Sequence, residues 1–294
     1  TEDDGSCQYE DVCGECGGDN SSCETILGCT DPEAENYNSN SSQEDGSCEY
    51  ENVGNNSLSF SEGQRANIPV SEATTNLESL TLELWYYEIS GEGEWIAGFE
   101  REGGSTYAID NDWGQYETTL SGLESGCAFS APGSGGGYPI TQNVWTHLAL
   151  TYDGSYTYFF VDGQMVYSQE CDIGPVGNPT SSIDINYHTW NNGGSSSSRL
   201  TGNIDELRIS NIARYSSDFI PPNYEFVPDE NTVGLWHFNN NFYDFSGNQN
   251  HGVHYGTSYS ENIPISEETT LGCTDSSACN YDDSALEDDG TCYY

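Results

Sequence analysis

The clearest pattern of hydrophobic and polar positions lies in residues 145–169. Side chains there alternate between two faces, with Leu148 and Leu150 on the same face, as expected for a half-buried strand. Asp153-Gly154 and Asp162-Gly163 interrupt the pattern and are strong hairpin signals, because two-residue turns need positive φ. We therefore expect three short antiparallel strands whose hydrophobic face is covered by a second sheet.

Similar patterns predict further strands and an all-β sandwich. Residues 80–89 alternate most cleanly, with Leu80, Leu82 and Leu84 on one face. Pro221-Pro222 marks an extended connector. Shorter strands are expected at 58–60, 66–70, 94–100, 106–110 and 182–190, a short helical turn at 211–219, and a closing strand at 233–238 beside the first strand.

Several separated motifs carry a family resemblance. The segment that contains them, roughly residues 53–257, resembles the concanavalin A-like jelly roll of the laminin-G type. The resemblance implies an all-β, two-sheet antiparallel jelly-roll sandwich, and a calcium ion on the loop that contains Asp244 and Asn248. The motifs are Trp-x-His-Leu-Ala-Leu-Thr-Tyr-Asp-Gly at 145–154, Phe-Val-Asp-Gly at 160–163, and the segments 202–209, 211–215, 233–238 and 244–252.

Composition narrows the class of protein. The chain has 294 residues with 49 acidic residues, five basic residues and a net charge of −44. Such a polyanion repels nucleic acid and anionic membranes and can recruit divalent cations. No hydrophobic run approaches the roughly 18 residues that a membrane helix needs. The 11 cysteines indicate an oxidising compartment, so we expect a secreted protein, present either as a mature chain or as a fragment of a longer one.

Both ends contain copies of an acidic repeat. A Gly-Cys-Thr-Asp motif, an Asn-Tyr pair and an Asp-Gly-Ser/Thr-Cys motif recur at 28–48 and 272–292, and a partial copy lies at 3–7. These copies resemble the short Cys-Thr-Asp repeats of secreted Bacteroidetes surface proteins. The segments are too poor in hydrophobic residues to form an ordinary core. The expected organisation is a Cys-rich arm at 1–27, a repeat at 28–52, the jelly roll at 53–260, and a linker with a second repeat at 261–294.

Oxygen-bearing side chains recur within each repeat. Hard oxygen ligands in a glycine-containing loop suit calcium, so calcium-stabilised repeats are one interpretation. The alternative is a solvated acidic loop held by a disulfide alone. The candidate ligands are Asp31, Asn36, Asn38 and Asp45 in the first repeat and Asp275, Asn280, Asp282 and Asp289 in the second.

The cysteines suggest three intramolecular pairs. Cys29–Cys48 and Cys273–Cys292 are the natural pairs within repeats, and Cys127–Cys171 lies in the jelly roll. Cys7 and Cys279 lack obvious partners and are candidates for links between subunits. Cys13 and Cys16 are expected to form a structural knuckle rather than a redox or zinc site, and the sequence does not assign a partner to Cys23.

Catalysis is not expected from the strand motifs. Laminarinase-type glucanases carry Glu-x-Asp-x-x-Glu on one strand, and the nearest match has Asn203 and Arg208 at the two outer positions. Asp205, Glu206 and Arg208 are expected to form a structural ion-pair cluster. The histidines lack a zincin context and are expected to be structural.

Aromatic residues beside glycine-rich loops could instead bind carbohydrate, or could simply fill the sandwich. The candidates are Trp113, Tyr116, Tyr138, Tyr187 and Trp190. Asn20, Asn40 and Asn55 are N-glycosylation sequons, and Ser284 lies in an Asp-Ser-Ala motif that resembles the O-glycan acceptor of Bacteroidetes proteins.

These observations favour a non-enzymatic extracellular structural or adhesive protein. The leading hypothesis is a subunit of a calcium-stabilised filament that joins head to tail through its Cys-rich ends, because contacts between unlike surfaces generate open fibres. The alternative is a lectin-like carbohydrate-binding module of a larger secreted adhesin or polysaccharide-degrading protein.

Overall fold

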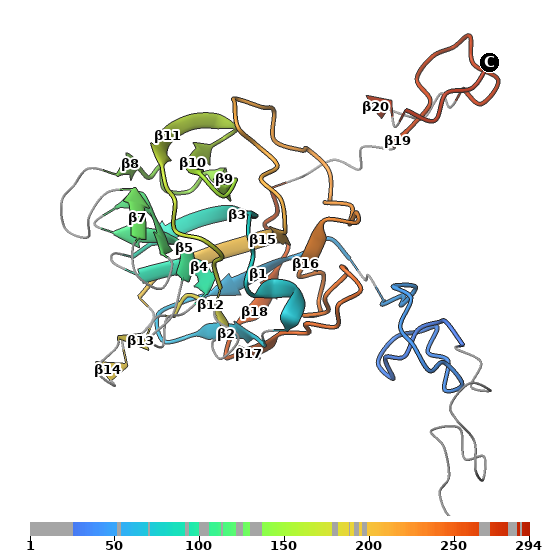
Figure 1. Cartoon of the computed structure of the whole chain (residues 1–294), viewed down its shortest axis with the longest axis horizontal. Coiled ribbons are helices and arrows are strands. Elements are labelled where there is room, and N and C mark those ends of the chain that lie inside the picture. The colour runs from blue at the N-terminus through green and yellow to red at the C-terminus, as the bar shows by residue number, and fades with distance from the viewer. Residues whose placement is uncertain are drawn as a thin grey trace, which may run out of the picture. The chain divides into compact units, whose positions relative to one another are not determined.

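The computed structural model is an antiparallel β-sandwich with small loop-dominated segments (Figure 1). It describes residues 26–51, 54–69, 71–91, 94–99, 106–112, 114–121, 126–129, 137–177, 182–187, 189–190, 194–195, 199–264, 271–281, 287–288 and 290–294. The chain divides into two compact units, residues 1–51 and 52–294.

Two large sheets form the sandwich. The first contains, in spatial order, β11 (Gln164–Glu170), β10 (Tyr156–Val161), β9 (Trp145–Tyr152), β3 (Leu80–Ser90), β15 (Thr201–Ser210), β1 (Ser57–Phe60) and β18 (Ser258–Ser260), with β16 (Thr232–Trp236) also paired to β15. The second contains β17 (Val253–Tyr255), β2 (Arg65–Ile68), β12 (Ile183–Ile185), β4 (Glu94–Phe99), β5 (Thr106–Asp112), β6 (Gln115–Ser121) and β7 (Gly126–Phe129), with β8 (Tyr138–Pro139) paired to β6.

The smaller elements lie outside these sheets. They are the pair β13 (Thr189–Trp190) and β14 (Gly194–Ser195), the pair β19 (Leu271–Gly272) and β20 (Glu287–Asp288), and the short 3₁₀ helix η1 (Glu72–Thr74).

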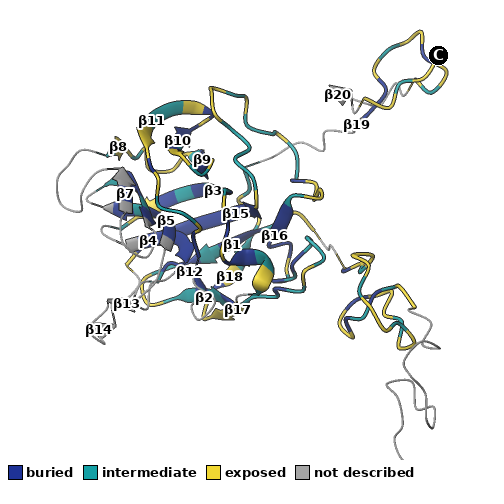
Figure 2. Cartoon of the chain, in the orientation of Figure 1, coloured by how far each residue is buried: buried dark blue, intermediate teal, exposed yellow. Residues whose placement is uncertain are grey.

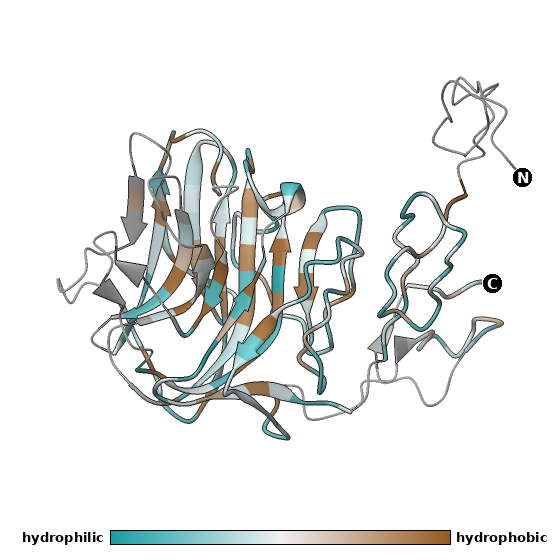
Figure 3. Ribbon diagram, turned by 90° about the horizontal axis from the view of Figure 1, so that it is seen from below, coloured by the Kyte–Doolittle hydropathy of each residue, from teal (hydrophilic) through white to brown (hydrophobic). Residues whose placement is uncertain are grey.

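The core lies between the two sheets. Leu82 and Leu84 of β3 and Leu150 of β9 are fully buried in the same cluster as Phe99 and Ile183 of the second sheet. Figures 2 and 3 show buried and hydrophobic residues along the strands. The alternation that predicts these strands therefore also predicts the face that each buries. The Cys127–Cys171 disulfide joins β7 of the second sheet to the residue after β11 of the first.

A long connector, residues 211–229, covers part of the outer face of the first sheet; we call it the strap. Its beginning consists of bends and irregular backbone, so the predicted helical turn at 211–219 is wrong. Backbone groups of the strap bond the sheet instead of one another: Thr151 Oγ1 donates to Tyr215 O at 2.9 Å. Gly163 permits close approach, because a Cβ there would lie 2.1 Å from Phe219 O.

The closing strand β16 pairs with β15 along Leu207–Ser210, whereas β1 pairs with β15 along Gly202–Ile204. The prediction that this segment lies beside the first strand is wrong in detail. β15 bonds both, one after the other, because it is longer than either.

Candidate functional site

The first repeat is held by hydrogen bonds that use most of the proposed calcium ligands. Asp31 is buried and accepts from Tyr50 Oη at 2.7 Å and from the Glu33 amide at 2.9 Å. Asn36 donates to Ser47 O at 2.5 Å and accepts from the Glu49 amide at 2.8 Å. These bonds tie the start of the repeat to its end across the Cys29–Cys48 disulfide.

The second repeat reproduces this arrangement. Asp275 accepts from Tyr294 Oη at 2.6 Å, and Asn280 bonds Thr291 O and the Tyr293 amide, both at 3.0 Å. The hydrogen bonds from Tyr294, then from Ser277, lower the pKa of Asp275 to about 2. The Cys273–Cys292 disulfide closes the copy. The repeat is therefore a hydrogen-bonded and disulfide-closed unit.

The calcium ligands proposed in the repeats do not form a described ion site. Asn38 and Asp45 accept backbone amides two residues ahead, at 3.1 and 3.0 Å. Asp282 and Asp289 lie outside the described residues. Among the described residues of the first repeat, Cys29, Glu44 and Cys48 bring three potential ligand atoms close together. The two cysteines are joined in a disulfide. The contacts described are those of a disulfide-held loop, and calcium binding by the repeats stays a prediction.

The oxygens of Asp244 in its loop are also bonded within the protein. Asp244 is fully buried, and its Oδ1 accepts the amides of Leu235 and Ser246 at 3.0 and 2.9 Å. Its Oδ2 accepts the Asn250 amide and Nδ2, both at 3.0 Å. Asn248 Nδ2 donates to Val233 O at 3.2 Å. Four donors occupy the lone-pair directions of the carboxylate, so this loop does not fit the implied calcium ion.

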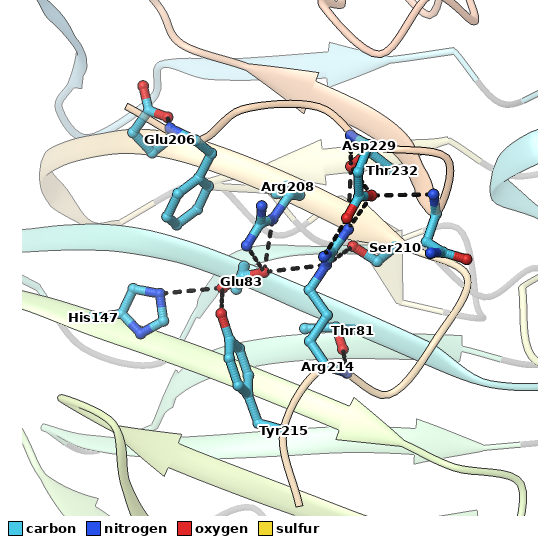
Figure 4. Close-up of polar contacts among 12 residues, drawn as sticks. Thr81, Glu83, His147, Glu206, Arg208, Ser210, Arg214, Tyr215, Asp229 and Thr232 are labelled. Atoms are coloured by element: carbon cyan, nitrogen blue, oxygen red, sulfur yellow. Dashed lines mark hydrogen bonds and ion pairs between the residues drawn. The ribbon is translucent and has the colours of Figure 1, made fainter. Parts of the chain in front are cut away.

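A buried network beneath the strap centres on Glu83 (Figure 4). Arg208 donates to Glu83 Oε1 from Nε at 2.8 Å and Nη2 at 2.7 Å, and Tyr215 Oη donates to Oε2 at 2.9 Å. His147 Nε2 lies 3.4 Å from Oε2. Burial raises the pKa of the Glu83 carboxyl, but His147 and Arg208 outweigh burial and bring it to about 2. The network fixes the strap to the sheet.

A second network surrounds Glu206, which lies at a bulge with φ of 52°. Its Oε1 contacts His237 Nδ1 at 2.7 Å, and its Oε2 accepts the Phe226 amide at 2.6 Å. Burial raises the pKa of Glu206, and the Glu206 charge raises the pKa of His237 despite its burial. The predicted cluster of Asp205, Glu206 and Arg208 is therefore wrong, because Arg208 pairs with Glu83 and Glu206 with His237.

Glu225 brings a third ligand atom within 4.8 Å of those of Glu206 and His237. A histidine nitrogen beside carboxylates is a donor set for zinc rather than calcium. Both Glu206 oxygens are already bonded within the protein, so the contacts of this group are those of a structural network. No sequence pattern signals this group, since Glu206 lies in β15, Glu225 in the strap and His237 directly after β16.

The aromatic candidates separate by exposure. Tyr116 is 1% exposed and packs edge-on against Tyr86, so its predicted role in carbohydrate binding is wrong. The alternation of Tyr116 with Leu120 on one face of β6 is the signal that could have placed it in the core. Tyr138 is 37% exposed on β8. Trp190 lies in β13, and Trp113 lies outside the described residues.

Tyr187 belongs to a cluster that we call the arginine clamp, which consists of Arg65, Tyr187 and Tyr255. Arg65 Cζ lies 4.2 Å from the centroid of the Tyr187 ring and 4.9 Å from that of Tyr255. Both distances are typical of cation–π contacts. Tyr255 is 49% exposed, and Arg65 and Tyr187 are half-buried.

The fold positions each member of the clamp. Tyr255 of β17 lies opposite Arg65 of β2 in the antiparallel register, so their side chains share a face. On the other side of β2, Asn186 follows the end of β12 with φ of 54°, and Tyr187 comes next. The buried Asn186 side chain donates to Gln64 O at 2.9 Å and to Leu200 O at 3.2 Å, which fixes this turn. One ring thus comes from β17 and the other from the segment that follows β12, and these two strands flank β2.

The remaining candidates concern cysteines and glycosylation. The three disulfides between described residues are the three pairs expected from the sequence, and disulfides are typical of extracellular proteins. Cys279 is exposed with a free thiol. Asn40 and Asn55 are exposed. Cys7, Asn20 and Ser284 lie outside the described residues. No helix in the described part of the chain is long and apolar enough to cross a membrane.

Comparison with known families identifies the class of protein. Residues 60–218, more than half of the chain, match the family model described as the concanavalin A-like lectin/glucanases superfamily. The chain belongs to this superfamily, in agreement with its two-sheet sandwich. No curated protein matches the sequence.

Solved structures with a similar fold are distant in sequence. A Bacteroides ovatus ATCC 8483 protein proposed to bind carbohydrate is 17% identical with a TM-score of 0.52; the match covers 75% of this chain and 64% of that protein. The CBM40 of the Ruminococcus gnavus IT-sialidase, bound to α2,3 sialyllactose, is 12% identical with a TM-score of 0.43, over 54% of this chain and 91% of that one. The heptameric SAP-like pentraxin of Limulus polyphemus is 11% identical with a TM-score of 0.42, over 70% and 98%.

Proposed function

We propose that this chain is a non-catalytic, extracellular carbohydrate-binding module and that it binds sugar at the arginine clamp. The observation that carries the proposal is the pair of tyrosines, Tyr187 and Tyr255, held around Arg65 on a sandwich of the lectin/glucanase superfamily. Aromatic rings that combine a hydrophobic face with a polar hydroxyl suit sugars, which present C–H groups on one side and hydroxyls at their edges.

The superfamily and the similar fold of a protein proposed to bind carbohydrate support this function. A non-catalytic role is supported by the two positions that carry glutamates in laminarinase-type enzymes. Asn203 donates to Ser57 Oγ at 2.9 Å, and Arg208 neutralises Glu83. Both side chains therefore maintain the fold.

The head-to-tail filament has less support than carbohydrate binding. It depends on Cys7, which lies outside the described residues, and on Cys279. Its proposed calcium ligands in the first repeat bond the protein itself. The alternative drawn from the sequence, a lectin-like module of a larger secreted protein, is therefore the function we propose.

A glycan array probed with the full chain tests the function. We expect saturable binding to a subset of glycans and a loss of about tenfold in affinity for Tyr255→Ala or Tyr187→Ala, because each ring contributes on the order of 1–2 kcal/mol of contact. Tyr156→Ala is the matched control: Tyr156 is 43% exposed on the other sheet and stacks on Tyr158. Absence of binding to any glycan, or equal affinity in the clamp variants and the wild type, would contradict the proposal.

A further inference from the structure

Arg65 differs from Arg208 and Arg214, which both form ion pairs in this structure. Arg208 bonds Glu83, and Arg214 bonds Asp229 through Nη1 at 2.9 Å and Nη2 at 2.7 Å. The Arg65 guanidinium has its two cation–π contacts but neither an ion pair nor a hydrogen bond with any described residue. An arginine without a carboxylate is unexpected in a chain with 49 acidic residues.

The nearby polar groups are bonded to one another rather than to Arg65. Asn67, two residues further along β2, donates to Asp184 Oδ1 at 2.7 Å, and Ser182 Oγ donates to the same oxygen at 3.2 Å. The aromatic contacts restrict the guanidinium while its N–H donors remain unused by the described residues. A guanidinium held in this way is preorganised for an acceptor with two oxygens in one plane.

We propose that the arginine clamp selects acidic sugars, with Arg65 bonding the anionic group and the two tyrosines contacting the ring. This inference rests on the proposed carbohydrate-binding function and adds the chemical class of the ligand. A carboxylate, as in a uronic acid, matches the planar fork of arginine, and a sulfate ester offers the same pair of oxygens.

The net charge of −44 restricts the ligand further. Repulsion from the remainder of the chain acts over the Debye length of about 10 Å at 0.1 M salt, whereas the contact at Arg65 is local. The clamp therefore suits a short or sparsely charged saccharide better than a densely charged polymer. Added salt screens the long-range repulsion more than the half-buried contact, so binding of a long polyuronate should strengthen as salt increases.

Isothermal titration of the full chain with three trisaccharides tests the selectivity. One is built of galacturonic acid, one of the methyl ester of galacturonic acid, and one of sulfated galactose. We expect the wild type to bind an acidic trisaccharide at least tenfold more tightly than the uncharged ester. The carboxylated and sulfated arms identify the preferred anion. Arg65→Gln should reduce this preference to less than twofold, and Arg65→Lys should retain part of it.

The outcomes separate the two proposals. Equal affinity of the wild type for acid and ester overturns acidic selectivity and leaves carbohydrate binding intact. An undiminished preference in Arg65→Gln also overturns the role of Arg65. Absence of binding to any arm or to a glycan array overturns both. Near-UV circular dichroism and a wild-type unfolding midpoint in urea establish that Arg65→Gln is folded.

Discussion

Arg208 and Arg65 make the same aromatic contact in two regions of the molecule. Arg208 Cζ lies 4.2 Å from the Phe226 ring centroid, and Arg65 Cζ lies 4.2 Å from that of Tyr187. Beneath the strap, Arg208 also pairs with fully buried Glu83. In the clamp, Arg65 has no carboxylate partner among the described residues. A cation–π contact alone therefore does not indicate whether an arginine serves the fold or a binding site. The two arginines differ in the segment that covers Arg208 and in the carboxylate that pairs with it.

The largest expected effect comes from removing the counter-charge beneath the strap. Glu83→Gln preserves the shape of the side chain but leaves Arg208 buried without its carboxylate, which should cost about 3–5 kcal/mol of unfolding free energy. Urea denaturation measures the loss. Glu62→Gln, at an exposed position, is the matched control and should change stability by less than about 0.5 kcal/mol.

Glu83→Gln also tests whether the two regions are independent. Below its unfolding transition the variant should bind glycans with wild-type affinity, because the clamp shares no residue with the Glu83 network. A loss of stability below about 1 kcal/mol would show that the network contributes less than its geometry indicates.

Acid should weaken the same network by a comparable amount. The carboxyl pKa of Glu83 is about 2 in the folded protein, whereas the ordinary pKa of an unpaired glutamate is 4.5. Because the folded pKa is the lower one, the contribution is complete above pH 4.5 and is lost as pH falls from 4.5 to 2, by about 3 kcal/mol. The difference in unfolding free energy between the wild type and Glu83→Gln should shrink over this range. A constant difference would exclude titration of Glu83 as its source.

Sequence patterns predicted the elements but not the contacts between distant segments. β9 and β3 lie where local alternation and the Asp-Gly turns place them, because these signals act within about ten residues. The clamp joins Arg65 to Tyr255, which is 190 positions away, and no local pattern specifies which edge strand lies beside β2. The sequence indicates Tyr187 as an aromatic residue beside a loop but does not indicate Arg65 or Tyr255 as its neighbours.

The strap and the repeats show a related limit of local sequence patterns. Thr81 Oγ1 donates to Ile212 O at 2.8 Å and accepts the Arg214 amide at 2.8 Å, so the sheet replaces the bonds of the expected helical turn. In the first repeat Asp31 bonds Tyr50, although oxygen ligands alone also suit calcium. The same polar residue types serve several structures, and only the partners distinguish them.

The smallest predicted effect concerns one tyrosine–aspartate hydrogen bond that both repeats make, buried in the first repeat and exposed in the second. Tyr50 and Asp31 are 7% and 5% exposed, whereas Tyr294, which makes the equivalent bond to Asp275, is 78% exposed. Tyr50→Phe removes a buried donor from a carboxylate and should cost about 1 kcal/mol, so local opening and reduction of Cys29–Cys48 by dithiothreitol should become about fivefold faster. Tyr294→Phe should accelerate reduction of Cys273–Cys292 by less than about twofold, because water replaces the lost partner. Equal acceleration in the two repeats would show that their shared bonding pattern, and not burial, determines what this contact contributes, and would weaken the distinction drawn between Arg208 and Arg65.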